Sequence, residues 1–376
     1  MRIGIEAQRI FRKKKHGMDM VALELIRALQ AANTTHQFIV FAQPDEDMAC
    51  LQEGNGIQIV LLPKSPYPIW EQWYLPKAVN KYKVDLLHCT SNTAPIFLSV
   101  PLVLTLHDII YLEKISLSQG TAYQKFGNIY RKWNVPIIAK KARKILTVSH
   151  FENQRIIEYF GFKKELVQTV YNAAAKHFTR ITDPQILANA KAKFNLPDSF
   201  IFFLGNTDPK KNVKGVLQAL SILKASGKLP CKLLMLDINR GYLQNLAQEI
   251  GDPSIVDEIT FTGYVPNQEL PAIYSQATLF LYPSLRESFG IPLVEAMRCE
   301  VPVITSNTSS MPEIVDDAAL ICDPFNPNSI ANAIFDLWNN PTLQSTLRNK
   351  GKLRGDSFSW KQNALDTLAI YQSIIQ

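Results

Sequence analysis

Residues 278–305 read TLFLYPSLRESFGIPLVEAMRCEVPVIT, and this stretch combines two apolar runs with a helical pattern between them. Continuous apolar runs such as 278–282 and 302–305 are typical of strands buried on both faces of a parallel sheet. The residues between them predict a helix that begins near Gly290–Pro292, because proline is favourable in the first helical turn. The stretch therefore predicts a strand–helix–strand unit of an α/β protein.

The same alternation continues outward over almost the whole chain, with amphipathic helical patterns at 18–31, 212–226, 241–250 and 326–339. A polar interval at 172–198 divides the apolar runs into two series. We therefore expect two doubly wound domains, joined near 173–198, with the active cleft between them. The first series of predicted strands is 2–5, 38–41, 57–62, 84–88, 101–106, 145–148 and 166–171, and the second is 200–204, 232–236, 259–261, 278–282, 302–305 and 319–322.

The composition excludes several classes of protein. Among 376 residues, 47% are hydrophobic and 19% charged, which argues against disorder and fibrous repeats. No apolar run reaches about 18 residues, the length that a membrane-spanning helix needs, and the N-terminus reads as a strand, not a signal peptide. The five cysteines lie far apart without a CxxC pair, so a zinc site or disulfide framework is not expected, and a reducing cytoplasm fits best.

The positive charge is uneven. The net charge of +7 arises in the first half, because residues 1–175 carry 22 basic and 14 acidic side chains. This excess indicates an anionic partner for the N-terminal half.

The loop and helix start at 285–295 carry the most informative chemistry. Unpaired amides at a helix N-terminus bind phosphate, and a carboxylate can accept two sugar hydroxyls at once. Glu287 and Glu295, with seven residues between them, could thus bind polyols on either side of a diphosphate. The alternative is a glutamate that complements the helix dipole plus a solvent-facing helix residue. The amides that we expect to point out of the helix are those of Phe289, Gly290, Ile291 and Leu293.

The sequence lacks a dinucleotide fingerprint and contains one short metal-binding-like pattern. No GxGxxG follows either candidate first strand, so the NAD-type fingerprint is absent. Asp45-Glu46-Asp47 has the DxD form of a metal-binding signature, but it lies in a polar loop far from the other motifs and is interpreted as a solvated turn. No metal ion and no cofactor are expected.

Several segments, taken together and in order, resemble retaining glycosyltransferases of family 4, also called glycosyl transferases group 1, which have the GT-B fold. Trp70-Glu71-Gln72 with Leu75-Pro76 resembles a segment of mannosyltransferase-like members. The resemblance covers nearly the full chain. Its motifs are TLHDIIYL (105–112), TVSHFE (147–152), VYNA (170–173), LGNTDPKKN (204–212), FTGYV (261–265), LYPS (281–284), ESFGIPLVEAM (287–297), PVITSNTSSMPEI (302–314) and CDP (322–324).

The resemblance implies a role for each matching residue. Glu295 would bind the ribose, Glu287 the donor sugar, and Lys211 the diphosphate, helped by Lys210 and the turn at Gly205. His107 would face the transferred sugar, although a lone histidine is more often a structural hydrogen-bonding residue. Asp108 could orient His107 or cap a turn. The sites so implied are catalytic His107, Lys211 and Glu287; donor-binding Gly205, Lys210, Lys211, Glu287, Ser288, Phe289, Gly290, Ile291, Leu293 and Glu295; and acceptor-binding Gly17, Asp108 and Ser149.

Some positions depart from the family pattern. Lys210 replaces an arginine, which removes the planar fork for bidentate phosphate contact. Ser288 replaces a glycine, so the loop must avoid a positive φ there. Glu300 replaces the glycine that normally ends this helix. None of these changes removes a chemical role.

The resemblance also implies a domain plan. It consists of an acceptor-binding Rossmann-like domain at 1–172, a linker region at 173–198, a nucleotide-sugar-binding Rossmann-like domain at 199–357, and a C-terminal helix at 358–376 that packs back on the first domain.

The predicted activity is metal-independent, retaining transfer of a hexose from a GDP- or UDP-linked sugar to a surface-glycan or lipid-linked acceptor. The first choice of donor is GDP-mannose. The alternatives are a nucleotide-sugar epimerase on the same fold, or a non-catalytic subunit that binds sugar nucleotides. The protein is expected in the cytoplasm or on the inner face of the plasma membrane.

Residues 121–144 contain seven basic and no acidic side chains. Tyr123, Phe126, Tyr130 and Trp133 recur at helical spacing until Pro136, which should kink or end the helix. A basic amphipathic helix of this kind can lie on an anionic membrane surface, or its aromatic residues can simply pack into the core. No nucleic-acid-binding motif is present, so a nucleic-acid partner is not expected.

Overall fold

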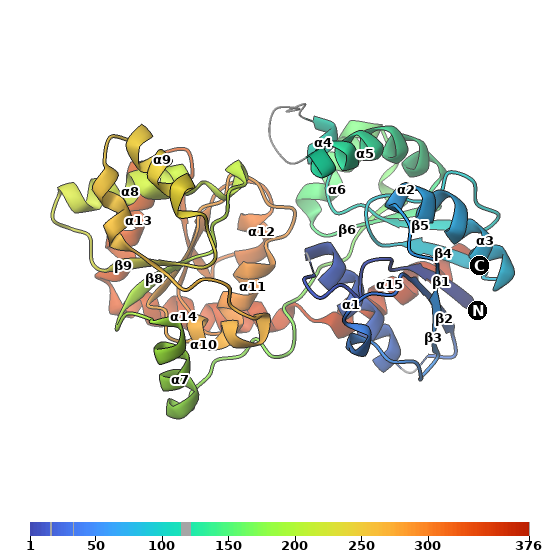
Figure 1. Ribbon diagram of the computed structural model, residues 1–376, viewed down its shortest axis with the longest axis horizontal. Helices are drawn as coiled ribbons and strands as arrows, with labels where there is room; N and C mark the ends of the chain where they lie inside the picture. Colours follow the sequence, from blue (N-terminus) through green and yellow to red (C-terminus); the bar gives the residue numbers. More distant parts are fainter. Residues whose placement is uncertain (16, 33, 114–121, 376) are drawn as a thin grey trace. The chain divides into compact units, whose positions relative to one another are not determined.

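The computed structural model describes residues 1–15, 17–32, 34–113 and 122–375 (Figure 1). The chain divides into two compact units. The first contains residues 1–172 together with 360–376, and the second contains residues 173–359.

The first unit is built on a seven-stranded parallel sheet in the order β3-β2-β1-β4-β5-β6-β7. The alternating apolar residues of β1 and β2 pair in register, with Ile3 opposite Phe38 and Ile5 opposite Val40. These strands are buried on both faces, as continuous apolar runs predict. The strands are β1 (Arg2–Glu6), β2 (Gln37–Ala42), β3 (Ile57–Leu61), β4 (Leu86–Cys89), β5 (Leu102–Thr105), β6 (Lys144–Thr147) and β7 (Val167–Thr169).

Helices cover this sheet, and the last helix of the chain, α15, packs against α1 within the same unit. Tyr371 of α15 places its hydroxyl 2.6 Å from Nδ1 of the buried His88 on β4. The helices are α1 (Gly17–Ala31), α2 (Tyr67–Ile69), α3 (Leu75–Lys81), α4 (Ile110–Glu113), α5 (Ala122–Lys141), α6 (His150–Phe160) and α15 (Trp360–Ile375), with a π-helical turn η2 (Trp70–Tyr74) between α2 and α3 and 3₁₀ turns η1 (Met48–Cys50) and η3 (Lys164–Leu166).

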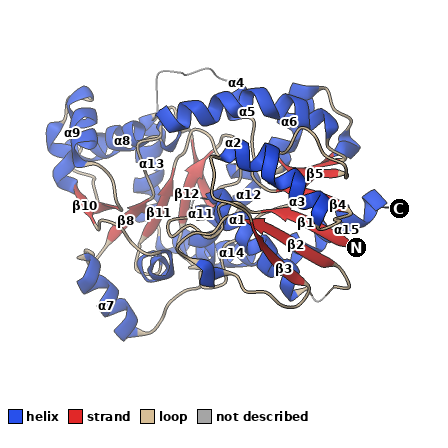
Figure 2. Ribbon diagram, turned by 45° about the vertical axis from the view of Figure 1, so that its right-hand side comes forward, coloured by secondary structure: helices blue, strands red, loops and turns tan. Residues whose placement is uncertain are grey.

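The second unit contains a six-stranded parallel sheet in the order β10-β9-β8-β11-β12-β13 (Figure 2). Its strands are β8 (Phe200–Phe203), β9 (Lys232–Met235), β10 (Ile259–Phe261), β11 (Leu279–Tyr282), β12 (Val303–Ser306) and β13 (Ala319–Cys322). Its helices are α7 (Pro184–Phe194), α8 (Val213–Ala225), α9 (Arg240–Glu249), α10 (Leu270–Tyr274), α11 (Ile291–Arg298), α12 (Met311–Val315), α13 (Pro327–Trp338) and α14 (Pro341–Ser357), with 3₁₀ turns η4 (Pro209–Lys211), η5 (Pro253–Glu258) and η6 (Asn267–Glu269).

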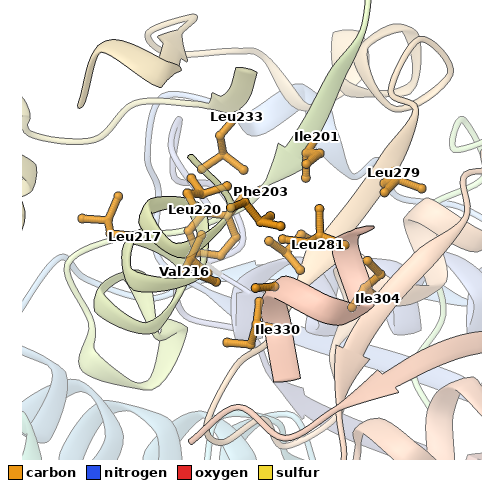
Figure 3. Close-up of a cluster of buried hydrophobic side chains, with 14 of the residues drawn as sticks. Ile201, Phe203, Val216, Leu217, Leu220, Leu233, Leu279, Leu281, Ile304 and Ile330 are labelled. Carbon is orange, nitrogen blue, oxygen red and sulfur yellow. The ribbon is translucent and has the colours of Figure 1, made fainter. Parts of the chain in front are cut away.

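Alternate residues of each strand in the second unit supply opposite faces of its core. Ile201 and Leu281 belong to the buried cluster that includes residues of α8 and α13. Figure 3 shows this cluster. Phe202 and Phe280 point to the other face, where their rings contact Tyr274 of α10. The sheet is thus covered on both faces, which leaves its carboxyl edge for polar loops.

Both sheets are doubly wound, and their strand order reverses once, between β1 and β4 in the first unit and between β8 and β11 in the second. Ligands of such sheets bind beyond the carboxyl ends of the strands at this switch point. The expected fold class is confirmed, and every predicted strand is present. One detail differs, because helix α7 occupies much of the polar interval at 173–198. In the described ranges, no helix combines the length and apolar character that crossing a membrane requires.

Candidate active site

The loops after β8 and β11, the two strands beside the switch point of the second unit, bring Lys211 and Glu287 together. The ammonium Nζ of Lys211 lies 2.6 Å from Oε1 of Glu287. The same Nζ donates to the hydroxyl of Tyr282 over 2.7 Å and lies 4.8 Å from the centre of that ring. The side chains of Lys211 and Glu287 are only 14% and 11% exposed. Sequence reasoning identified both residues for this site but did not predict their direct contact.

The loop that carries Lys211 is tied to the loop that carries Glu287. The backbone amide of Leu285 donates to the carbonyl of Lys210 over 2.7 Å. Asn212 stands at the predicted start of α8, but its side chain does not cap the helix. Instead it donates to the carbonyl oxygens of Pro283 and Pro324 over 3.1 and 2.7 Å, respectively. Asn212 therefore joins three loops at the carboxyl edge of the sheet.

Gly205 and Lys210 occupy the ends of the same loop. A Cβ at Gly205 would lie 2.5 Å from the ring of Phe203 and 3.0 Å from the methyl of Met235, so only glycine fits this close approach. The side chain of Lys210 lies 3.7 Å from Asp208 and is 39% exposed. The structure therefore places Lys211, and not Lys210, at the buried carboxylate.

Helix α11 begins where the sequence predicted, but one of the amides expected to be unpaired at its start is hydrogen-bonded. Gly290 has a φ of +93°, a conformation that favours glycine, and Ile291 begins the helix. The amide of Ile291 has no intrahelical acceptor, because it belongs to the first turn. The amide of Leu293, in contrast, donates to the carbonyl of Gly290 over 2.9 Å, so the expectation that it points out of the helix is wrong. Ser288 has no positive φ, as its replacement of glycine requires.

Three serines, one at the end of β12 and two shortly after it, support the Glu287 loop, and sequence reasoning missed them. Ser310, which is fully buried, donates to the carbonyl oxygens of Glu287 and Phe289 over 3.0 and 3.2 Å, respectively. Ser309 accepts from the amide of Glu287 over 3.0 Å, and Ser306 donates to the carbonyl of Ser284 over 2.6 Å. The signal was present in the hydroxyl-rich run SNTSS at 306–310, which begins with the last residue of β12 at the same sheet edge.

Glu295 lies one turn inside α11, as predicted, and is 9% exposed. Its Oε2 accepts from the hydroxyl of Tyr274 over 3.1 Å. Burial raises the pKa of the Glu295 carboxyl to about 7, and the Tyr274 hydrogen bond opposes that rise. Among the described residues no basic side chain contributes to this pKa, so the carboxylate is not held in an ion pair and can accept ligand hydroxyls.

His107 follows β5 in the first unit and is buried there. Its Nε2 lies 2.9 Å from the carbonyl of Thr90, and its amide donates to Oδ1 of Asn92 over 2.6 Å. Because a carbonyl only accepts, Nε2 must carry the proton in this contact. Burial lowers the pKa of His107, which favours the neutral ring with an unprotonated Nδ1.

The three residues predicted to bind the acceptor lie in different local settings of the first unit. Asp108 accepts from the amide of Ile110 over 3.2 Å and so caps the turn at the start of α4. Ser149 caps α6 by accepting from the amide of Glu152 over 3.2 Å. Gly17 begins α1, and a Cβ there would meet no atom within 4 Å.

The Asp45–Asp47 loop also lies in the first unit. Asp47 forms an ion pair with Lys15, and Oδ1 of Asp45 accepts from the amide of Glu46 over 2.9 Å. Across the described part of the chain, no group of three or more histidine, cysteine, aspartate or glutamate side chains is placed to hold a metal ion.

Two family models match the chain in succession. Residues 16–175 match the model described as Glycosyltransferase Family 4, and residues 186–354 match Glycosyl transferases group 1. The two matches correspond to the two units of the structure and include every residue of the Lys211–Glu295 site.

Individual proteins show the same similarity over three quarters of the chain or more. O-antigen chain mannosyltransferase B of Escherichia coli is 26% identical over 377 residues, which covers 95% of this chain and 96% of that protein. O-antigen chain mannosyltransferase RfbU of Salmonella typhimurium is 25% identical over 282 residues, covering 75% and 73%. Among solved structures, Anabaena HepE in complex with UDP superposes with a TM-score of 0.75 at 17% identity, covering 99% of this chain and all of that one. That structural likeness supports a GT-B fold.

Proposed function

Since the chain belongs to the group 1 glycosyltransferases and carries a family 4 domain ahead of the group 1 domain, we propose that it transfers mannose from GDP-mannose to a growing glycan. Similarity to two O-antigen chain mannosyltransferases supports mannose as the sugar. The HepE structure was also solved with UDP-glucose, so UDP-glucose and UDP-N-acetylglucosamine are the competing donors. The observation that carries the proposal is the Lys211–Glu287 pair beside the start of α11.

We propose that the donor diphosphate displaces the Glu287 carboxylate from Lys211. Negative charge grows on the leaving diphosphate as the glycosidic bond breaks, and a lysine fixed by Tyr282 is oriented to stabilise it. The amides of Gly290 and Ile291 at the positive end of the α11 dipole would bind the distal phosphate. Glu287, released from the lysine, would accept hydroxyls of the donor sugar.

Glu295 would bind the two ribose hydroxyls. It stands four residues after Ile291 in α11, which separates it from the amide of Ile291 by about 6 Å along the helix axis. The distance between Glu295 and this amide suits a nucleoside diphosphate whose phosphates bind the start of α11 and whose ribose reaches Glu295. Because Tyr274 already donates to Oε2, Oε1 is the oxygen that would accept a ribose hydroxyl first.

The proposed reaction retains the anomeric configuration. The acceptor hydroxyl attacks the face that the diphosphate leaves, and the departing phosphate oxygen takes the acceptor proton. No enzyme nucleophile is required in this sequence of bond changes. His107, neutral and with Nδ1 unprotonated, would accept a hydrogen bond from a hydroxyl of the transferred sugar.

We further propose that the acceptor is a glycan on a lipid carrier, and that the enzyme works at the inner face of the plasma membrane. The printed functions of the two mannosyltransferases, which concern O-antigen chains, support a surface-glycan acceptor. Such acceptors are assembled from cytoplasmic nucleotide sugars, so donor and acceptor would meet at a membrane surface.

A donor panel tests the proposal. The protein is incubated with labelled GDP-mannose, UDP-glucose or UDP-N-acetylglucosamine and a lipid-linked oligosaccharide that ends in mannose. We expect label to enter the lipid fraction from GDP-mannose alone, with an α-linkage by NMR. Transfer only from a UDP-sugar would contradict the choice of donor. Interconversion of a donor without any acceptor would identify an epimerase, and binding of all donors without turnover would identify a non-catalytic subunit.

A further inference from the structure

The most exposed large apolar side chains of the first unit come from three segments that contact one another. Five such residues are more than half exposed in its described part, with exposed fractions between 52% and 83%. They come from three segments, namely the α2–η2 turn, the loop after β4, and α5. We call these five residues the amphipathic face, and they are Ile69, Trp73, Phe97, Ile129 and Trp133.

Hydrogen bonds hold the three segments together. Glu71 of η2 accepts from the hydroxyl of Tyr130 on α5, and Gln72 donates to that same hydroxyl over 2.7 Å. Gln72 also accepts from the amide of Ile96 over 2.9 Å, and Lys141 of α5 donates to the carbonyl of Ile96 over 2.9 Å. The three segments therefore form one continuous surface.

The exposed residues follow helical spacing on two of these segments. Ile69, Trp73 and Lys77 are separated by four residues each, so they share one face of the α2–η2–α3 helix. Ile129 and Trp133 are also four residues apart on α5. The exposed faces of both helices thus carry an isoleucine followed by a tryptophan.

Lysines lie against the aromatic rings of the amphipathic face. Lys77 places Nζ 3.9 Å from the centre of the Trp73 ring, and Nζ of Lys141 lies 5.3 Å from that of Phe97. Residues 66–84, 93–98 and 127–144 contain nine lysines and arginines but one acidic residue, Glu71, which is fully buried. The face therefore combines exposed aromatic groups with two adjoining lysines, and the segments that form it carry an excess of basic side chains, which we call its basic rim.

The structure changes the membrane-binding prediction made for residues 121–144. Tyr130 turns inward to Glu71, while Trp133 points outward, and Pro136 does not end α5, which continues to Lys141. The side chains of Tyr123 and Phe126 lie outside the described residues. Three of the five exposed apolar residues, Ile69, Trp73 and Phe97, lie outside the predicted segment.

We propose that the amphipathic face and its basic rim bind the surface of an anionic lipid bilayer. Tryptophan favours the boundary between lipid headgroups and acyl chains, and lysine stems can lie along apolar surface while their ammonium groups reach lipid phosphates. A second copy of the chain is a poorer partner, because a two-fold interface would set the same basic residues against one another. This inference goes beyond the proposed transfer reaction, since it requires neither donor nor acceptor.

Vesicle binding by the full chain tests the proposal. The protein is sedimented with vesicles of phosphatidylglycerol and phosphatidylcholine, or of phosphatidylcholine alone, at low and at high salt. We expect binding to the anionic vesicles at low salt and its loss at high salt, because salt screens surface charge. Brominated lipids should quench part of the tryptophan fluorescence, and this quenched part should disappear in a Trp73→Phe, Trp133→Phe variant.

Matched variants test whether the vesicles bind this surface and not another part of the molecule. Trp73→Ser with Trp133→Ser should weaken vesicle binding by roughly tenfold or more, and Lys140→Glu should weaken it at low salt. Phe325→Ser, which changes an exposed aromatic residue of the second unit, and Lys361→Glu on α15 should leave it unchanged. Circular dichroism and donor binding check that each variant is folded.

Three results would overturn the proposal. They are no binding to anionic vesicles at low salt, unchanged binding by the double tryptophan variant, or a dimer in solution that the same variant dissociates. None depends on sugar transfer, so a failure of this proposal is distinguishable from a failure of the proposed activity.

Discussion

At the scale of single residues, the burial of Glu295 should make nucleotide binding depend on pH. Its raised pKa of about 7 means that a large fraction is protonated near neutral pH, and only the ionised form offers both oxygens to a ribose. We therefore expect affinity for the nucleoside diphosphate to increase as the pH rises through about 7.

Replacing this carboxylate tests its role. Glu295→Ala should weaken binding of the nucleoside diphosphate by roughly tenfold to a hundredfold at pH 8, because a charged hydrogen bond contributes about 1.5–3 kcal/mol. Calorimetry between pH 6 and 8 measures both this loss and the pH dependence, which the variant should lack. Glu249→Ala, on the exposed helix α9, is the control. Equal affinity in a folded Glu295→Ala protein would exclude the ribose contact.

Lys211 should matter more for catalysis than for binding. Because the leaving-group charge is greatest in the transition state, Lys211→Ala should lower kcat by about a hundredfold while donor affinity falls less. Steady-state kinetics with separately measured donor affinity gives the comparison. Lys210→Ala, whose side chain faces Asp208, should have a much smaller effect. A change confined to KM would show that Lys211 serves only binding.

Position 205 requires a glycine because the neighbouring side chains leave no room for a Cβ atom. Gly205→Ala places a methyl 2.5 Å from the Phe203 ring, so the core must shift, and we expect a loss of about 1–3 kcal/mol in the free energy of unfolding. Urea denaturation measures this loss. Gly17→Ala is the matched control, because the added methyl meets no atom within 4 Å, and its stability should change by less than about 1 kcal/mol. An effect of Gly17→Ala on acceptor KM alone would support the predicted acceptor contact.

At the scale of elements, the η2 turn is joined to α5 through a buried carboxylate. Glu71 accepts hydrogen bonds from Thr93 and Tyr130, and the pKa of its carboxyl is raised to about 7 because burial outweighs these bonds. The folded state then binds a proton between pH 4.5 and about 7 that the unfolded chain has released. The stability contributed by this group therefore decreases as the pH rises over that range and levels off above it.

Glu71→Gln should remove this pH dependence. As the pH rises from 4.5 to 8, the unfolding free energy of the wild type should fall relative to that of the variant, by at most about 3 kcal/mol. Urea titrations at several pH values measure it. Glu53→Gln, which changes an exposed glutamate of the same unit, should leave the profile parallel to that of the wild type. A constant difference at all pH values would mean that Glu71 titrates normally.

The short segments that hold the site could not be located from periodicity. The long helices and buried strands have clear periods, so their positions follow from the pattern of apolar residues. The turn at 209–211 and the serine-rich segment at 306–310 have no period, and their positions depend on hydrogen bonds between loops. Similarly, the outward direction of Trp133 depends on which face of α5 packs on the sheet.

At the scale of the whole molecule, the proposed reaction requires no metal ion. The positive charge for the diphosphate would come from Lys211 and the start of α11. We therefore expect EDTA to leave transfer within about twofold of its untreated rate, since the proposed electrostatic stabilisation comes from fixed protein groups. Restoration of lost activity by Mg²⁺ or Mn²⁺ would contradict the mechanism and direct attention to the Asp45–Asp47 loop. Asp45→Asn with Asp47→Asn should otherwise leave the rate unchanged.

The sequence alone predicted two doubly wound sheets, and it singled out Glu287 and Glu295, because buried parallel strands and helix starts leave local patterns. Lys211 was predicted only from the resemblance to family 4 glycosyltransferases. Only the tertiary structure brought Lys211 within 2.6 Å of Glu287 and joined the segments of Trp73, Phe97 and Trp133 into one surface. These contacts connect atoms that are close in space but belong to different segments or turns. Local sequence specifies which elements form, whereas packing between elements decides which side chains meet and which remain exposed.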